Sequence, residues 1–169
     1  ASAPKLGASA RLSGTLPPSL GNLVRLEHLL VDQTQISGTL PLSLGGLTAL
    51  QYVSMLANSF TGVIPEIFFE LTALIGLDLQ HNELSGTLSE SIGELSQLKS
   101  LTLYGNNLSG TLSETIGKLA ALKSLQLQNN RFSGTVPDTF AALTSLRLLF
   151  LQSNSFTAVG SGICAIQDH

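Results

Sequence analysis

One pattern of 24 residues recurs along nearly the whole chain without an insertion or a deletion. Each unit begins with a large apolar residue followed by Ser or Thr, and these first residues are Leu12, Ile36, Phe60, Leu84, Leu108, Phe132 and Phe156. The six full units are 12–35, 36–59, 60–83, 84–107, 108–131 and 132–155, and a seventh loses the pattern after Ala158. A fixed period of about 20 to 50 residues is typical of solenoids, in which each unit stacks on its neighbours.

The spacing within a unit predicts its local structure. Leu101 and Leu103 are two residues apart and share one face of a strand, whereas Thr102 between them faces the other way. The leucines before this strand are three residues apart, which favours a short 3-10 or helical turn. A single unit buries too few apolar side chains to offset the entropy of ordering its backbone, so the units must stack and share one core.

An asparagine recurs near the end of five units, and the first unit has Thr34 at that position. An amide at a fixed place beside a core strand can satisfy the backbone groups of the following turn. These asparagines therefore predict a hydrogen-bonded ladder rather than a binding site. They are Asn58, Asn82, Asn106, Asn130 and Asn154.

The consensus of the units, L-x-x-L-x-x-L-x-x-L-x-L-x-x-N-x-L-S-G-x-[LIV]-P, resembles the leucine-rich repeat in its 24-residue plant-type form. That form occurs in receptor-kinase ectodomains and polygalacturonase-inhibiting proteins, and the stretch 34–41 also resembles the repeats of trypanosomatid surface antigens. The resemblance implies an α/β fold, a right-handed solenoid with a concave parallel sheet, a convex side of short 3-10 turns, and a second short sheet at Ser-Gly-Thr. It divides the chain into a degenerate N-terminal cap (1–11), six repeats (12–155), and a partial repeat with a C-terminal cap (156–169).

The sequence departs from that form in two respects. The paired cysteines that cap secreted plant members do not occur, because Cys164 is the single cysteine. The expected role of Cys164 is that of a small buried apolar residue, with pairing to a cysteine outside this sequence as the alternative. In addition, Ser89 and Ser113 replace the usual proline in two repeats.

The family generally binds its partners through the outward positions of the concave strands, so the resemblance places the candidate site there. Exposed aromatic side chains are the usual anchors of protein interfaces, and uncharged Gln, Ser and Thr between them supply hydrogen bonds. The expected binding residues are Tyr52, Leu56, Asp78, Gln80, Thr102, Tyr104, Gln126, Gln128 and Phe150. At the ends of the solenoid, Leu30, Leu148 and Phe150 have the alternative of being covered by the terminal segments.

Other classes of function find less support in the sequence. The eight Lys and Arg residues form no basic run or face, which argues against nucleic acid as a partner. No apolar stretch approaches the roughly 20 residues that span a bilayer, and no His or Cys accompanies Cys164 at a metal-ligand spacing. The glycines punctuate the repeats instead of forming a phosphate loop, so no cofactor is expected. His28 and Asp32 share a face, yet no nucleophile lies beside them at a known motif spacing.

The sequence thus predicts a non-catalytic recognition module that binds a protein, with three alternatives open. The first is binding of ice or another ordered lattice by columns of hydroxyls, because stacked coils lie about 4.8 Å apart; the same Ser-Gly-Thr segments are also ordinary turn chemistry. The others are glycan binding and a structural spacer, and inhibition of a secreted enzyme stays open as one form of protein binding. The threonine column, which Val63 interrupts, consists of Thr15, Thr39, Thr87, Thr111 and Thr135. Low charge and one glycosylation sequon, Asn107-Leu108-Ser109, favour an extracellular or cell-surface location.

Overall fold

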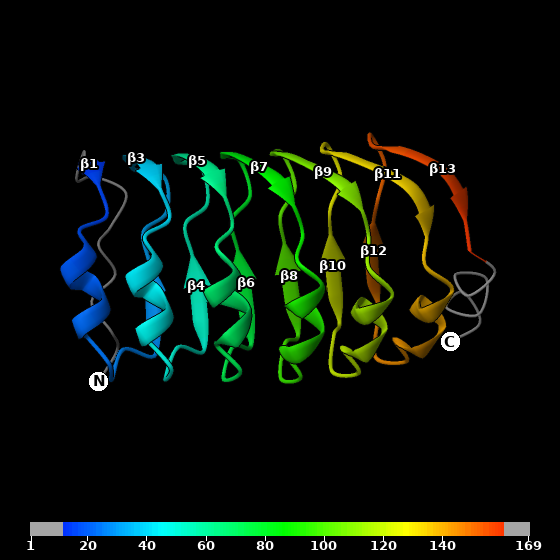
Figure 1. The fold of residues 1–169 in the computed structure, drawn as a ribbon, viewed down its shortest axis with the longest axis horizontal. Helices are drawn as coiled ribbons and strands as arrows, with labels where there is room; N and C mark the ends of the chain where they lie inside the picture. Colours follow the sequence, from blue (N-terminus) through cyan, green and yellow to red (C-terminus); the bar gives the residue numbers. More distant parts are fainter. Residues whose placement is uncertain (1–11, 161–169) are drawn as a thin grey trace.

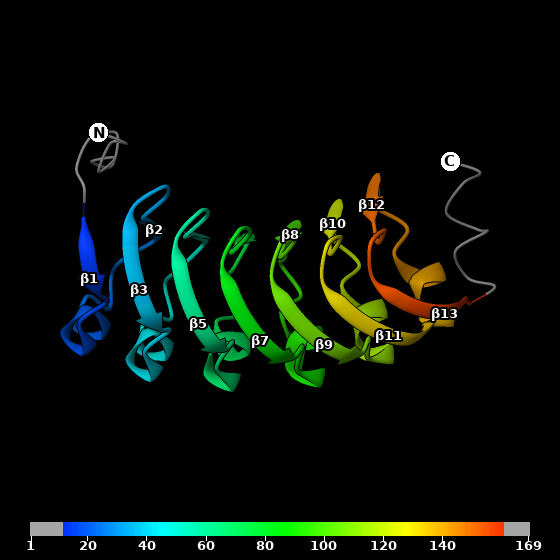
Figure 2. The ribbon, with the colours of Figure 1, turned by 90° about the horizontal axis from the view of Figure 1, so that it is seen from above.

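The computed structural model describes residues 12–160, so the predicted N-terminal cap, Cys164 and most of the predicted C-terminal cap lie outside the described residues. The chain winds into coils that stack side by side (Figure 1). Seen from above in Figure 2, the coils fan along an arc, with one set of strands on its inner side and short 3-10 helices on its outer side. The predicted α/β solenoid is confirmed.

The inner, concave side of the arc is a six-stranded parallel sheet with one three-residue strand from each repeat. Equivalent residues pair across a full repeat, so that Leu101 is in register with Leu77 on one side and Leu125 on the other. All three leucines are at most 1% exposed, which confirms that the alternation points them into the core. The strands are β2 (His28–Leu30), β4 (Tyr52–Ser54), β6 (Gly76–Asp78), β8 (Ser100–Thr102), β10 (Ser124–Gln126) and β12 (Leu148–Phe150).

A second parallel sheet of seven strands forms where the Ser-Gly-Thr segments stack. Its strands are β1 (Ser13–Thr15), β3 (Gln35–Thr39), β5 (Ser59–Val63), β7 (Glu83–Thr87), β9 (Asn107–Thr111), β11 (Arg131–Val136) and β13 (Ser155–Val159). The 3-10 helices of the convex side are η1 (Pro18–Asn22), η2 (Leu42–Gly46), η3 (Glu66–Glu70), η4 (Glu90–Glu94), η5 (Glu114–Lys118) and η6 (Asp138–Ala142). Each repeat therefore contributes one element to each side of the coil.

The asparagine ladder is confirmed by its hydrogen bonds. The Nδ2 group of Asn106 donates to the carbonyls of Leu79 and Leu103, and its Oδ1 atom accepts from the backbone N–H of Leu84, all at 3.0 Å. The same three kinds of bond recur at Asn82, Asn130 and Asn154. In the first repeat, the hydroxyl of Thr34 donates to Oδ1 of Asn58. The ladder satisfies backbone groups that stacking would otherwise bury without partners.

The two serines that replace proline cap their 3-10 helices. Ser89 Oγ accepts a hydrogen bond from the N–H of Ser91 at 3.0 Å, and Ser113 Oγ accepts one from the N–H of Thr115 at 3.2 Å. Proline at the equivalent position, as at Pro65, makes no such bond. Serine is a favoured residue at a helix N-cap, so the substitution exchanges a fixed backbone angle for a hydrogen bond.

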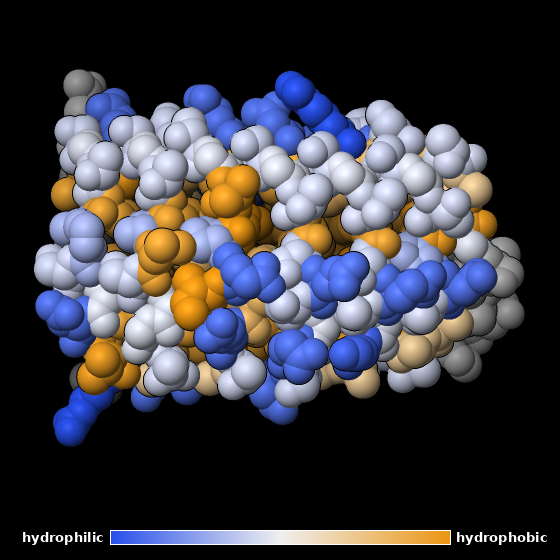
Figure 3. Space-filling model, viewed as in Figure 1, coloured by the Kyte–Doolittle hydropathy of each residue, from blue (hydrophilic) through white to orange (hydrophobic). Residues whose placement is uncertain are grey.

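The convex face differs in character between its two halves. Figure 3 shows apolar side chains gathered over the N-terminal half and hydrophilic ones over the C-terminal half. Leu42 on η2 and Val63 on β5 are the most exposed apolar side chains of the repeats 36–59 and 60–83, at 73% and 56%. Acidic residues that begin the last four 3-10 helices are all exposed: Glu66, Glu90, Glu114 and Asp138.

Candidate functional site

The predicted binding residues lie on the concave sheet and in the turns that directly follow its strands. Asp78, Thr102, Gln126 and Phe150 occupy one register position on successive strands. Exposed side chains include Tyr52 at 39% and Phe150 at 36%, whereas Thr102 is only 6% exposed and offers little surface to a ligand. The remaining residues of the set are half-buried: Leu56, Asp78, Gln80, Tyr104, Gln126 and Gln128.

Two aromatic pairs stand out on this face. The rings of His28 and Tyr52 are stacked, with centroids 5.0 Å apart and an interplanar angle of 29°. Gly76 on the next strand leaves room for the tyrosine, because a Cβ there would lie 3.1 Å from Tyr52 Cδ1. The tyrosine ring is therefore held between a histidine on one strand and a bare backbone on the other.

The second pair joins His81 and Tyr104, whose ring centroids are 4.8 Å apart at an interplanar angle of 79°. His81 has a φ of 52° in the turn after β6, and its ring lies over Gly105, where a Cβ would be 2.9 Å from Nδ1. His81 is not among the predicted binding residues, because strand alternation alone leaves it in the turn beyond β6. The sequence signal that could have identified His81 is Gly105. It is the one glycine at a turn position that has positive φ in every repeat, and the other residues at this position are Gln33, Ala57, His81, Asn129 and Ser153.

Two carboxylates of this face, in the first and third repeats, accept hydrogen bonds from both backbone and side-chain groups. Asp32 Oδ1 accepts hydrogen bonds from the Ser54 hydroxyl and from the N–H of Leu56. Asp78 accepts from the N–H of Gln80 at 3.1 Å and from Gln80 Nε2 at 2.8 Å. Burial raises the pKa of the Asp78 carboxyl above its ordinary value, against the opposing effect of both bonds from Gln80, and the nearby charge of Asp32 adds to the increase.

The glutamines of the fifth repeat keep part of their hydrogen-bonding capacity free. Gln126 Nε2 donates to Ser124 Oγ at 3.2 Å. Gln128 Oε1 is buried, and no hydrogen bond to it forms within residues 12–160. An unsatisfied buried acceptor of this kind carries a free-energy cost.

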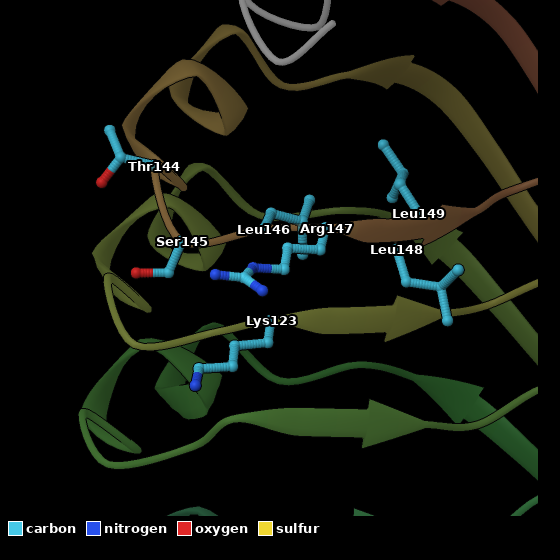
Figure 4. Close-up of a pocket in the computed structure, with 7 residues that line it drawn as sticks. All are labelled: Lys123, Thr144, Ser145, Leu146, Arg147, Leu148 and Leu149. Atoms are coloured by element: carbon cyan, nitrogen blue, oxygen red, sulfur yellow. The ribbon is translucent and has the colours of Figure 1, made fainter. Parts of the chain in front are cut away.

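A hollow of about 720 Å³ lies at the C-terminal end of the concave sheet, between β12 and the turn before it. Figure 4 shows the charged ends of Lys123 and Arg147 pointing in the same direction there, with the hydroxyls of Thr144 and Ser145 in the adjoining turn. Leu148 at its rim is 39% exposed. The segment expected to cover Leu148 and Phe150 lies in 161–169, beyond the described residues.

The described part of the chain brings together no group of three or more His, Cys, Asp or Glu side chains that could hold a metal ion. Its helices are 3-10 helices of five residues each, and none between residues 12 and 160 has the length and apolar character to cross a membrane. The contacts found among the described residues of the concave face are aromatic contacts and hydrogen bonds.

A family model described as leucine rich repeat matches residues 48–108 and 96–156, which together span more than half of the chain. The protein belongs to the leucine-rich repeat family. Comparison with curated protein sequences gives no match. The family assignment therefore rests on the repeat itself and on the structures that share it.

Several solved structures resemble this leucine-rich repeat protein closely. The ectodomain of the receptor kinase GASSHO1/SCHENGEN3 from Arabidopsis thaliana, in complex with Casparian strip integrity factor 2, is 36% identical with a TM-score of 0.85 over 86% of this chain. The Arabidopsis receptor kinase HAESA, in complex with the peptide hormone IDA and the co-receptor SERK1, is 33% identical with a TM-score of 0.84 over 86% of this chain. A plant ice-binding protein is 32% identical with a TM-score of 0.81, again over 86% of this chain. The chain spans 18%, 24% and 47% of those chains, respectively.

Proposed function

We propose that this leucine-rich repeat protein is a non-catalytic recognition module whose concave face binds an extended segment of a protein partner. The observation that carries the proposal is the presence of two His–Tyr pairs, His28–Tyr52 and His81–Tyr104, on one face with half-buried glutamine side chains beside them. Tyrosine is enriched among the residues that dominate binding energies. A ring already held by its neighbour loses little conformational freedom when a ligand binds, which favours affinity.

The similar structures support this proposal. Two of them hold a bound ligand, and one of these ligands is described as a peptide hormone. Both proteins are receptor kinases, and the structure of the first is that of its ectodomain. We therefore also propose an extracellular or cell-surface location for this protein.

Selection from a library of random heptapeptides displayed on phage tests the proposal. Peptides enriched on the wild-type protein should bind the double variant Tyr52→Ala, Tyr104→Ala at least about 10-fold more weakly, because truncating a hot-spot residue costs about 2 kcal/mol or more and about 1.4 kcal/mol is a factor of ten. The matched control is Leu42→Ala, Val63→Ala, which removes two exposed apolar side chains from outside the concave face and should leave affinity unchanged.

All proteins in this comparison should have the same thermal midpoint, so that differences in affinity report the surface and not the fold. Equal loss of binding in both double variants would show that the concave face has no special role. Failure of the wild type to enrich any peptide would also refute the proposal.

A second candidate function rests on the threonine column of the seven-stranded sheet. A Cβ added at Gly110 would lie 2.7 Å from Thr87 Cγ2, so the threonine methyl packs over the glycine of the next coil. Thr87 is exposed, and its hydroxyl makes no hydrogen bond to any residue between 12 and 160. Repeated hydroxyls of this kind, together with the likeness to a plant ice-binding protein, favour binding to an ordered lattice.

Thermal hysteresis of the purified protein tests this second candidate. The wild type should show a hysteresis gap that the double variant Thr87→Lys, Thr111→Lys lacks, because two long charged side chains interrupt the column. The absence of hysteresis in the wild type at high protein concentration would remove the candidate.

A further inference from the structure

Charged side chains change sign along the concave face from its N-terminal to its C-terminal end. The clearest case is the residue directly before each concave strand, here called the pre-strand column. Backbone hydrogen bonds of 2.7 to 2.9 Å join its successive members, from the N–H of each residue to the carbonyl of its predecessor. The column consists of Glu27, Gln51, Ile75, Lys99, Lys123 and Arg147. It therefore begins with one anion and ends with three adjacent cations.

The other charged residues on and beside the concave face show the same change from acidic to basic along the chain. The first three repeats add the carboxylates of Asp32, Asp78 and Glu83, and one cation, Arg25, lies in the turn before β2. The last three repeats add Arg131 at the start of β11. Their acidic residues, Glu90, Glu94, Glu114 and Asp138, all lie on the 3-10 helices of the opposite, convex side. The concave face is therefore acidic over β2–β6 and basic over β8–β12.

The cations of the pre-strand column are available to a ligand. Lys99, Lys123 and Arg147 are exposed, and none of them makes a side-chain hydrogen bond or ion pair with another residue between 12 and 160. In contrast, Lys118 on the convex side pairs with Glu94 at 3.4 Å. Lys123 and Arg147 also border the C-terminal hollow shown in Figure 4, next to the hydroxyls of Thr144 and Ser145. These groups suit carboxylate oxygens, which accept hydrogen bonds from both cations and hydroxyls.

The dimensions of the face set the length of the ligand. Five strand intervals of about 4.8 Å separate β2 from β12, which is roughly 24 Å. An extended peptide advances about 3.3 Å per residue, so about seven residues reach from the acidic end to the basic end. The two ends are farther apart than the Debye length of about 8 Å at physiological ionic strength, so each end attracts its own part of the ligand.

We propose that the partner segment is an extended peptide of about seven residues with opposite charges at its two ends, the cationic end lying over β2–β6 and the acidic end over β8–β12. This inference rests on the proposed function, because it requires the concave face to bind a peptide. Electrostatic complementarity fixes the orientation and the register of a ligand and excludes wrong partners. Tyr52, on β4, and Tyr104, after β8, lie inward of the two terminal strands β2 and β12, so their rings then contact the middle part of the peptide.

The same heptapeptide library tests the charge order. Peptides enriched on the wild-type protein should carry Lys or Arg near one end and Asp or Glu near the other. One such peptide should bind the triple variant Lys99→Glu, Lys123→Glu, Arg147→Glu about 10- to 100-fold more weakly at physiological salt, because three favourable contacts become unfavourable. The control reverses three exposed charges on the convex side, Glu70→Lys, Glu90→Lys and Glu114→Lys, and should bind within about twofold of the wild type.

The outcomes separate this inference from the proposed function. Tyrosine-dependent peptides with no charge order, or a triple variant that binds as well as the wild type, would overturn the charge order and leave peptide binding in place. Peptides that bind independently of Tyr52 and Tyr104 would overturn both. An equal loss of affinity in the convex control would show that net charge, and not its arrangement on the concave face, governs binding.

Discussion

Replacing Asn106 with alanine should destabilise the protein more than its size suggests. The amide makes three buried hydrogen bonds, one from the N–H of Leu84 and two to the carbonyls of Leu79 and Leu103. Both carbonyls keep a second donor, because Asn82 Nδ2 also donates to Leu79 and Asn130 Nδ2 also donates to Leu103. Only the N–H of Leu84 is left buried and unpaired.

The loss of stability in Asn106→Ala can be estimated from the one unpaired donor and the two acceptors that keep a partner. An orphaned buried donor costs about 1 to 3 kcal/mol, and each lost bond whose acceptor keeps another partner costs about 0.5 to 1.5 kcal/mol. The sum for Asn106→Ala is about 2 to 6 kcal/mol, a large part of the roughly 5 to 15 kcal/mol by which a typical protein is stable. The neighbouring Asn107 is half-buried and accepts an exposed hydrogen bond from Arg131, so Asn107→Ala should cost less than about 0.5 kcal/mol.

Urea denaturation followed by circular dichroism measures both variants against the wild type. A lower midpoint with an unchanged dependence on urea would report a change in stability, and amide exchange at Leu84 should be fastest in Asn106→Ala. If Asn106→Ala unfolds within about 0.5 kcal/mol of Asn107→Ala, the ladder does not stabilise the stack as its geometry indicates.

Two further predictions concern the second sheet and the concave face. Gly110→Ala should lower the thermal midpoint more than Gly14→Ala, because both glycines have positive φ but only at Gly110 does a Cβ meet Thr87 Cγ2, at 2.7 Å; equal shifts would exclude that contact as the cause. The raised pKa of Asp78 means that its contribution to stability is present below its ordinary pKa of about 3.9 and is lost as pH rises through the raised value. The free energy of unfolding of the wild type, relative to Asp78→Asn, should therefore fall over that pH range in urea titrations, and a constant difference would contradict the shift.

The sequence predicts the fold because one physical constraint repeats in it. The two-residue spacing of Leu101 and Leu103 determines which side of the strand enters the core, and the identical spacing in every repeat determines that the strands stack in register. The role of Asn106 follows from its fixed place after the strand. The capping by Ser89 could not be predicted with the same ease, since serine in a turn has several possible hydrogen-bond partners.

The candidate site is less predictable because it depends on how side chains lean across strands. Alternation and the 24-residue period place Thr102 on the concave face between Asp78 and Gln126, yet they do not show that its side chain is nearly buried there. The contact of His81 with Tyr104 depends on a left-handed backbone at His81 and on the bare backbone of Gly105. Neither feature is visible in the hydrophobic period that identifies the repeat.

The asparagine ladder also imposes an order on folding during synthesis. A backbone N–H after one concave strand finds its acceptor only on the asparagine that follows the next concave strand. The N–H of Leu84, for example, donates to Asn106, which is 22 residues later in the chain. At a translation rate of about 5 to 20 residues per second, that delay is on the order of 1 to 4 s. During synthesis, each coil should therefore complete its hydrogen bonds only after the next coil has been made. Until then, the last turn of the nascent chain keeps one backbone N–H without its asparagine acceptor.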